Sequence, residues 1–230
     1  MCTVTFSPRK TGFALAMNRD ELLARPAGLP PTRKILNGRA IIYPSEPGGG
    51  TWISVNQSGV CFALINWYAV ATHVQGETVS RGKIITTIGA AALPYVADEL
   101  LEKYPLRKTN PFRLIGVFSA THEIIEWRWN LKKLIRKKRR WQMRQWISSG
   151  FDEPIAQRMR GKTFRQAQQQ NSAGSLDWLR RLHRSHLPAA GPFSTCMHRA
   201  DAATVSYTEV TVARSQAAMR CLPCSPCQSI

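Results

Sequence analysis

Runs of β-prone residues separated by turn sequences predict that the chain opens with β-hairpins. Residues 2–7 and 13–18 flank the turn-like PRKTG, which is typical of two antiparallel strands joined by a short loop. Residues 51–56 and 60–67 form a second pair, with turn-forming residues between them. A short strand is also expected at 41–43.

Prolines and helix-capping residues divide much of the remaining chain. The prolines of 25–34 predict a loop, because proline lacks the N–H group that strands and helices use. The helical pattern of 81–104 is expected to divide at Pro94. The two acids and the proline at 152–154 favour the start of a helix to about 170, and Ser175 can cap another that runs to 184.

The order of these elements indicates the fold class. The other apolar runs predict strands at 112–119, 124–130, 141–148, 194–198, 204–212 and 217–221. Strands and helices therefore come in blocks, and tight turns join successive strands. This order favours an α+β fold with largely antiparallel sheets over a doubly wound parallel sheet. We expect a single domain over 1–230, with a flexible tail at 221–230.

The composition is that of a globular protein. The chain has 230 residues, of which 43% are hydrophobic, so it can bury a sizeable core. It has no run of about 18 apolar residues and no apolar leader after Met1, so neither a transmembrane segment nor a secretion signal is predicted. A cytoplasmic location is expected, and the sequence does not indicate an oligomeric state.

Positive charge is concentrated in one segment. The formal net charge is +18, and residues 128–144 contain nine basic residues and no acidic one. Such a run can bind nucleic acid, since Lys and Arg release counterions from phosphates. Charge runs are more often solvated, so we expect the segment to connect two strands and regard nucleic-acid binding as the least favoured function. A third interpretation is that this basic segment binds an anionic ligand.

The cysteines and histidines raise the question of a metal site. Cys221, Cys224 and Cys227 form a C-x2-C-x2-C run, and thiolates bind zinc or iron, but the run lacks a fourth ligand. His183 and His186 have helical i, i+3 spacing, and His198 lies two residues after Cys196. Each arrangement is also common in ordinary surfaces and cores. We therefore predict neither a metal nor a cofactor.

The N-terminus carries the residues that best suit catalysis. Removal of Met1, which a small second residue permits, leaves Cys2 with a thiol and an α-amine on one residue. The amine, with an ordinary pKa of about 7.7–8.0, can act as the base for the thiol. If the first two strands pair, Arg19 and Asp20 lie beside Cys2, and the amide of Asn66 could stabilise an oxyanion.

These residues belong to a set of motifs that resembles the NRDE family, also called the transport and Golgi organization protein 2 family. The set extends over nearly the whole chain and comprises Cys2-Thr3, Asn18-Arg19-Asp20-Glu21, Arg25-Pro26, Gly49-Gly50-Thr51-Trp52, Asn66, Ser80-Arg81-Gly82, Asn110-Pro111-Phe112, Ser148-Ser149-Gly150-Phe151-Asp152-Glu153, Cys196-Met197-His198-Arg199 and Thr204-Val205-Ser206-Tyr207-Thr208.

The resemblance implies an N-terminal nucleophile (Ntn) hydrolase fold, a four-layer αββα sandwich with antiparallel sheets. Penicillin V acylases and bile-salt hydrolases share this fold and begin with Met-Cys-Thr. By that likeness Cys2 is the nucleophile, Arg19 and Asp20 are its partners, Asn66 is an oxyanion donor, and Arg199 is a later catalytic Arg. The acylases also use a later Asn, whereas this chain has Ser148-Ser149-Gly150 where eukaryotic family members have Leu-Ser-Asn.

Two functions follow from the residues and the resemblance together. The first is an N-terminal-Cys hydrolase that acts on an amide or a thioester. The second is a non-catalytic carrier of an anionic, lipid-like or haem-like ligand that occupies the same pocket. Both predict a small-molecule partner, and neither identifies it.

Overall fold

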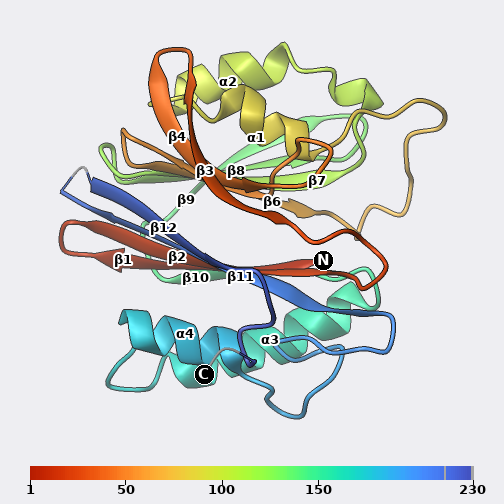
Figure 1. Cartoon of the computed structure of the whole chain (residues 1–230), viewed down its shortest axis with the longest axis vertical. Helices are drawn as coiled ribbons and strands as arrows, with labels where there is room; N and C mark the ends of the chain where they lie inside the picture. Colours follow the sequence, from red (N-terminus) through yellow and green to blue (C-terminus); the bar gives the residue numbers. More distant parts are fainter. Residues whose placement is uncertain (215, 229–230) are drawn as a thin grey trace.

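Two antiparallel β-sheets stack face to face, and a pair of helices covers the outer side of each sheet (Figure 1). The computed structural model describes residues 1–214 and 216–228. The chain order interleaves the layers, because the five-stranded sheet takes strands from both ends of the chain. The predicted α+β class and the four-layer αββα arrangement are confirmed.

The elements have the following bounds. The five-stranded sheet contains, in spatial order, β10 (Arg144–Ser148), β1 (Cys2–Arg9), β2 (Gly12–Leu22), β11 (Ala202–Ala213) and β12 (Gln216–Leu222). The seven-stranded sheet contains β3 (Leu29–Leu36), β4 (Arg39–Ser45), β5 (Ile53–Asn56), β6 (Val60–Asn66), β7 (Phe112–Phe118), β8 (Glu123–Trp129) and β9 (Leu134–Arg139). The helices are α1 (Gly82–Ile88), α2 (Pro94–Glu102), the 3-10 turn η1 (Leu106–Lys108), α3 (Glu153–Ala167) and α4 (Leu176–Arg184).

Three apolar layers hold the sandwich together. The largest lies between the sheets and includes Val4, Phe6 and Met17, which point inward from β1 and β2. A second layer packs α1 and α2 on the seven-stranded sheet, and a third packs α4 on the five-stranded sheet. Side chains alternate between the two faces of a strand, so β1 and β2 contribute to the middle layer and also contact the helices.

Helix boundaries follow the capping residues that the sequence indicates. Pro94 occupies the first turn of α2, where the missing N–H removes no helical hydrogen bond. Asp152 accepts a hydrogen bond from the backbone of Ile155 and caps α3, while Ser175 accepts one from Trp178 and caps α4. No helix among the described residues is long and apolar enough to cross a membrane.

Three local expectations were wrong. Residues 29–34, expected in a loop, belong to edge strand β3, where Pro30 and Pro31 are tolerated because an edge strand leaves N–H positions unpaired. Residues 194–198 form no strand and contribute a single bridge, between His198 and Ala203. Cys221 lies within β12 rather than in a flexible tail.

The basic segment also differs from expectation, because much of it is a strand rather than a connection. Strand β9 lies at an edge of the seven-stranded sheet, and its Lys and Arg side chains disfavour pairing with another sheet edge. Four of the nine basic residues of 128–144 form ion pairs in the described structure, with Glu126, Asp98 or Glu123 as acceptor: Arg128, Arg136, Lys138 and Arg139.

Glu126 is the centre of this charge arrangement. Its carboxylate is fully buried and accepts hydrogen bonds from Arg113 at 2.9 Å, Arg128 at 2.8 Å and Arg139 Nε at 2.7 Å. Burial alone would raise the pKa of Glu126, but the hydrogen bond from Arg128 and the charge of Arg113 outweigh burial and lower it to about 2. Glu126 therefore keeps three guanidinium groups from β7, β8 and β9 together.

We predict that Glu126→Gln lowers the free energy of unfolding by about 3–5 kcal/mol at neutral pH, because it leaves the buried Arg113 and the partly buried Arg128 and Arg139 without their counter-charge. The pKa is depressed in the folded state, so the Glu126 contribution is complete above the ordinary value of 4.5 and is lost as the pH falls toward about 2. Urea denaturation across that range measures both effects. Glu123→Gln on the same strand is the control, with an expected loss below about 1 kcal/mol. Equal losses for the two variants would contradict the assignment.

Candidate active site

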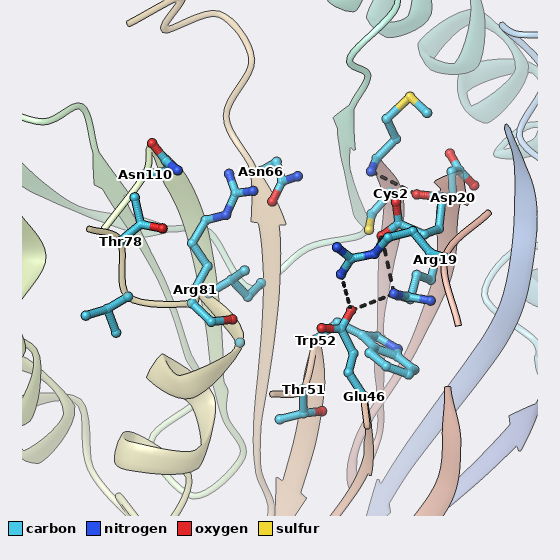
Figure 2. Close-up of a pocket in the computed structure, with 17 residues that line it drawn as sticks. Cys2, Arg19, Asp20, Glu46, Thr51, Trp52, Asn66, Thr78, Arg81 and Asn110 are labelled. Atoms are coloured by element: carbon cyan, nitrogen blue, oxygen red, sulfur yellow. Dashed lines mark hydrogen bonds and ion pairs between the residues drawn. The ribbon is translucent and has the colours of Figure 1, made fainter. Parts of the chain in front are cut away.

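Cys2, Arg19, Asp20 and Asn66 line one cavity of about 270 Å³ at an end of the sandwich (Figure 2). Cys2 is the first residue of β1, and the β1–β2 hairpin places Arg19 directly across from it. Asn66 is the last residue of β6 in the opposite sheet. The two hairpins foreseen in the sequence thus bring together four of the five expected residues from both sheets.

The Cys2 side chain faces the space between the sheets and is 7% exposed. Burial raises the pKa of its thiol, although the charges of the N-terminal ammonium and Arg19 and a hydrogen bond from the Asp20 backbone act in the opposite direction. The thiol is therefore protonated at neutral pH until a base removes its proton. A nucleophilic role for Cys2 needs such a base nearby.

Arg19 is fixed in position by two carboxylates and a ring. Its Nη2 lies 2.6 Å from Glu46 Oε1 and 3.2 Å from Glu21 Oε2, and its guanidinium stands 4.6 Å from the centre of the Trp52 ring. These contacts hold the positive charge beside Cys2 (Figure 2). The two carboxylates also offset that charge. Arg19 therefore acts on the thiol electrostatically and is not free to bind another anion.

Asp20 points to the other face of the sheet, because successive side chains of a strand alternate. Its carboxylate is fully buried, accepts a hydrogen bond from Thr204 Oγ1 at 2.7 Å and forms an ion pair with Arg160 Nη1 at 2.9 Å. The same Arg160 atom donates to Thr3 Oγ1 at 2.7 Å. The carboxylate thus attaches α3 to β1, β2 and β11, and Arg160 is a site residue that the sequence analysis missed.

The backbone of Asp20 holds Met1. The Met1 ammonium donates to the Asp20 carbonyl, and the Asp20 N–H donates to the Met1 carbonyl, both at 2.9 Å. Loss of Met1 has two consequences at this point. It places the α-amine on Cys2 itself, and it leaves the Asp20 N–H without its carbonyl acceptor, directly beside the thiol.

Asn66, which lines the cavity, forms a polar pair with Tyr68, which lies behind the lining residues. Asn66 Nδ2 donates to the Tyr68 hydroxyl oxygen at 2.8 Å, which leaves the phenolic proton free to point elsewhere. The Tyr68 ring also fills the space beside Gly150, where a Cβ would lie 3.0 Å from ring atoms of Tyr68. Gly150 stands where the family resemblance implies an Asn, so a tyrosine occupies that space in this chain.

Arg81 approaches Asn66 from the opposite wall of the cavity (Figure 2). Two glycines allow this position: a Cβ on Gly82 would lie 2.9 Å from the Gly50 Cα, so the start of α1 and the loop before β5 touch through their backbones. Arg81 Nη1 donates to the Pro111 carbonyl at 3.1 Å, and no ion pair to Arg81 is present among the described residues. Burial lowers its pKa, but an arginine stays charged.

The structure does not bring Arg199 to this cavity. Its guanidinium pairs with Asp201 at 2.7 Å and stands 4.7 Å from the centre of the Phe151 ring. Arg81 was present in the quoted Ser80-Arg81-Gly82 motif, but nothing in its local sequence marked it as the cation that reaches the cavity. Side chains of the types that bind metals lie elsewhere: His186, Cys196, His198 and Cys227 gather near the C-terminal segment.

A larger, apolar cavity of about 560 Å³ lies next to the first one. Its lining includes prolines and half-exposed leucines from the end of β2, the start of β3 and the segment between them, among them Leu22, Leu23 and Leu29. Arg19, Glu21, Arg25 and Trp52 line both cavities. The site thus combines a small polar cavity at the thiol with an apolar space on the other side of the Arg19–Trp52 pair.

Two solved structures, a penicillin V acylase and a conjugated bile acid hydrolase, have the same fold. Penicillin V acylase from Agrobacterium tumefaciens superposes with a TM-score of 0.55 and 11% identity, covering 91% of this chain and 79% of the acylase. The C2A mutant of the conjugated bile acid hydrolase from Clostridium perfringens gives a TM-score of 0.53 and 10% identity, covering 96% and 92% of the two chains. These likenesses establish the Ntn-hydrolase fold.

Sequence comparison gives the family. No curated protein matches the chain. The family model described as Transport and Golgi organisation 2 matches residues 1–175, which include both hairpins, Cys2 and the whole polar cavity. The chain therefore belongs to the Transport and Golgi organisation 2 family, with an Ntn-hydrolase fold.

Proposed function

We propose that the protein is an N-terminal-Cys acyl hydrolase that cleaves an amide or a thioester. The position of Cys2 carries this proposal: its thiol lies in a polar cavity beside a fixed arginine, and one peptide bond separates it from a free α-amine. The amine that Met1 removal creates supplies the base that the buried thiol lacks. The Ntn-hydrolase fold supports this assignment.

The reaction proceeds in two stages. The Cys2 α-amine takes the thiol proton, the sulfur attacks the carbonyl carbon, and a tetrahedral oxyanion forms. The C–N or C–S bond then breaks, and the leaving amine or thiol takes the proton from the α-ammonium. Water attacks the resulting thioester on Cys2 while the amine accepts a proton from the water. The acid leaves, and the thiol recovers its proton.

Two donor groups of the polar cavity support stabilisation of the oxyanion. The Asp20 N–H loses its partner with Met1, and Asn66 Nδ2 keeps a second N–H besides the one that donates to Tyr68. Donors fixed before the reaction cost no reorganisation when charge develops. Tyr68, whose ring lies beside Gly150, accepts the Asn66 hydrogen bond and so fixes the orientation of this donor.

The two cavities suggest how a substrate is oriented. The apolar cavity has room for an acyl group, and the polar cavity has room for the leaving group. Arg81 lacks an ion-pair partner among the described residues, whereas Arg19 and Arg25 are paired with Glu46. Arg81 is therefore the cation available to an anionic group of the substrate.

One observation also favours a non-catalytic carrier. The apolar cavity is roughly twice as large as the polar one and would hold a lipid-like acyl ligand whether or not Cys2 reacts. A carrier binds fatty acyl-CoA without consuming it, whereas the hydrolase releases fatty acid and free thiol. Equilibrium binding and thiol release, measured on one preparation, distinguish the two functions.

We predict that Cys2→Ala abolishes turnover of acyl amides and acyl-CoA esters while the protein stays folded. Intact mass of the native protein should show loss of Met1 and, after rapid quenching with substrate, an acyl adduct on residue 2. Cys61→Ala is the control, because Cys61 is buried between the sheets away from the cavity, and its turnover should match native. Unchanged turnover in Cys2→Ala, or native protein that retains Met1 and still hydrolyses substrate, would refute the mechanism.

We predict that Arg81→Met lowers kcat/KM for substrates with an anionic leaving group by about 10–100-fold, the value of a hydrogen bond to a charged group. Neutral substrates should lose much less. Arg25→Met is the matched control, since Arg25 lines the same cavity but is half-exposed and paired with Glu46, and it should change kcat/KM less than about twofold. Equal losses for anionic and neutral substrates would exclude a role for Arg81 in charge recognition.

A further inference from the structure

Two histidines and two cysteines from three separate segments converge on one point outside the polar cavity. His186 follows α4, Cys196 and His198 lie in the loop before β11, and Cys227 lies beyond β12. One ligand atom from each residue lies within 4.8 Å of all the others. The catalytic proposal gives none of these residues a chemical role, although His198 also lines the apolar cavity.

Three of the six distances between these atoms are close to the edges of a zinc tetrahedron, and the other three are within 4.8 Å. Zinc bonds of about 2.3 Å to sulfur and about 2.05 Å to nitrogen give edges of about 3.4 Å between two nitrogens and about 3.6 Å between sulfur and nitrogen. The observed separation of His186 Nε2 and His198 Nε2 is 3.1 Å. His198 Nε2 lies 3.7 Å from Cys196 Sγ and 3.5 Å from Cys227 Sγ.

The surroundings of the cluster support fixed ligands. Cys196 is fully buried, and the Ser225 hydroxyl lies 3.2 Å from both Cys196 Sγ and Cys227 Sγ, where it can donate to a thiolate. Hydrogen bonds of this kind orient the ligands of metal sites. The backbone of Met197, between two of the ligands, is bonded at 2.8 Å to Thr204 through both its N–H and its carbonyl.

The ligand set selects the ion. Two thiolates and two imidazoles in a tetrahedron are typical of zinc, whereas calcium and magnesium require oxygen ligands. An iron–sulfur cluster with two histidines and two cysteines spreads these ligands over two iron atoms. Four ligand atoms within 4.8 Å of one another instead fit the coordination sphere of a single ion.

We propose that His186, Cys196, His198 and Cys227 bind one Zn²⁺ in a structural site. Protein atoms fill all four positions, so the ion has no open position for substrate or water. It links the C-terminal segment to the loop before β11. In that loop the Met197 backbone is hydrogen-bonded to Thr204 of β11, whose hydroxyl donates to Asp20. The ion therefore also supports the buried carboxylate behind the catalytic cavity.

The experiment uses the full-length protein, purified under reducing conditions and loaded with Zn²⁺. Elemental analysis after removal of free metal should give one zinc per chain. The Co²⁺-substituted protein should show the strong visible absorption of tetrahedral cobalt together with thiolate-to-cobalt charge transfer. Chelation of the metal should lower the Tm of the native protein, because an ion that binds only the folded state stabilises it.

Three variants locate the site. Cys227→Ser and His186→Ala should each weaken zinc binding about 100-fold or more. Cys224→Ser is the matched control, since Cys224 lies in the same segment but outside the cluster, and it should bind zinc as the native protein does. If Cys227→Ser does not fold, the cobalt spectrum of His186→Ala and of the native protein still decides the question.

Two results would overturn the proposal. One is reduced, folded native protein that retains no zinc after loading. The other is equal zinc affinity in the Cys224→Ser and Cys227→Ser variants. Neither measurement depends on hydrolysis, so the zinc site and the proposed enzyme activity can fail independently.

Discussion

The buried ion pair between Arg160 and Asp20 is the constraint on which the arrangement of the site depends. Both side chains are fully buried, so each charge is tolerable only because the other is present. Arg160 also donates to Thr3 and to the Pro192 carbonyl, and Asp20 accepts from Thr204. One salt bridge therefore connects α3, the first hairpin, β11 and the loop that precedes it. This network fixes the strands that carry Cys2 and Arg19, whose side chains lie on the other face of the same sheet.

Most of the fold was predictable because its elements are local. The two N-terminal hairpins, the division at Pro94 and the caps at Asp152 and Ser175 each follow from short sequence signals, and the structure confirms them. The two strands that were wrongly predicted as a loop and a connection have a common feature. Edge strands β3 and β9 are polar on both faces or carry prolines, so they lack the alternation that marks a half-buried strand. Their partners in the sheet, not their own residues, make them strands.

The part of the site that the β1–β2 hairpin determines could be predicted from the sequence. Pairing of β1 with β2 places Arg19 opposite Cys2 by register alone, and the end of the second hairpin contributes Asn66. Arg160 and Arg81 were missed because each reaches its partners across a large sequence separation. The four metal-ligating residues were missed for the same reason: C-x2-C-x2-C spacing suggested that Cys221, Cys224 and Cys227 act together, whereas only Cys227 joins the cluster.

The partition between the two cavities has a consequence for the family. Arg19 and Trp52 line both spaces, so the barrier at this place includes side chains held by Glu21 and Glu46. Side chains can change rotamer or be replaced without altering strand pairing. In relatives that have both hairpins and the thiol, a single replacement of a wall residue can therefore enlarge or shrink either cavity, or merge the two. Ligand size can diverge in this way while the scaffold and its charge network stay the same.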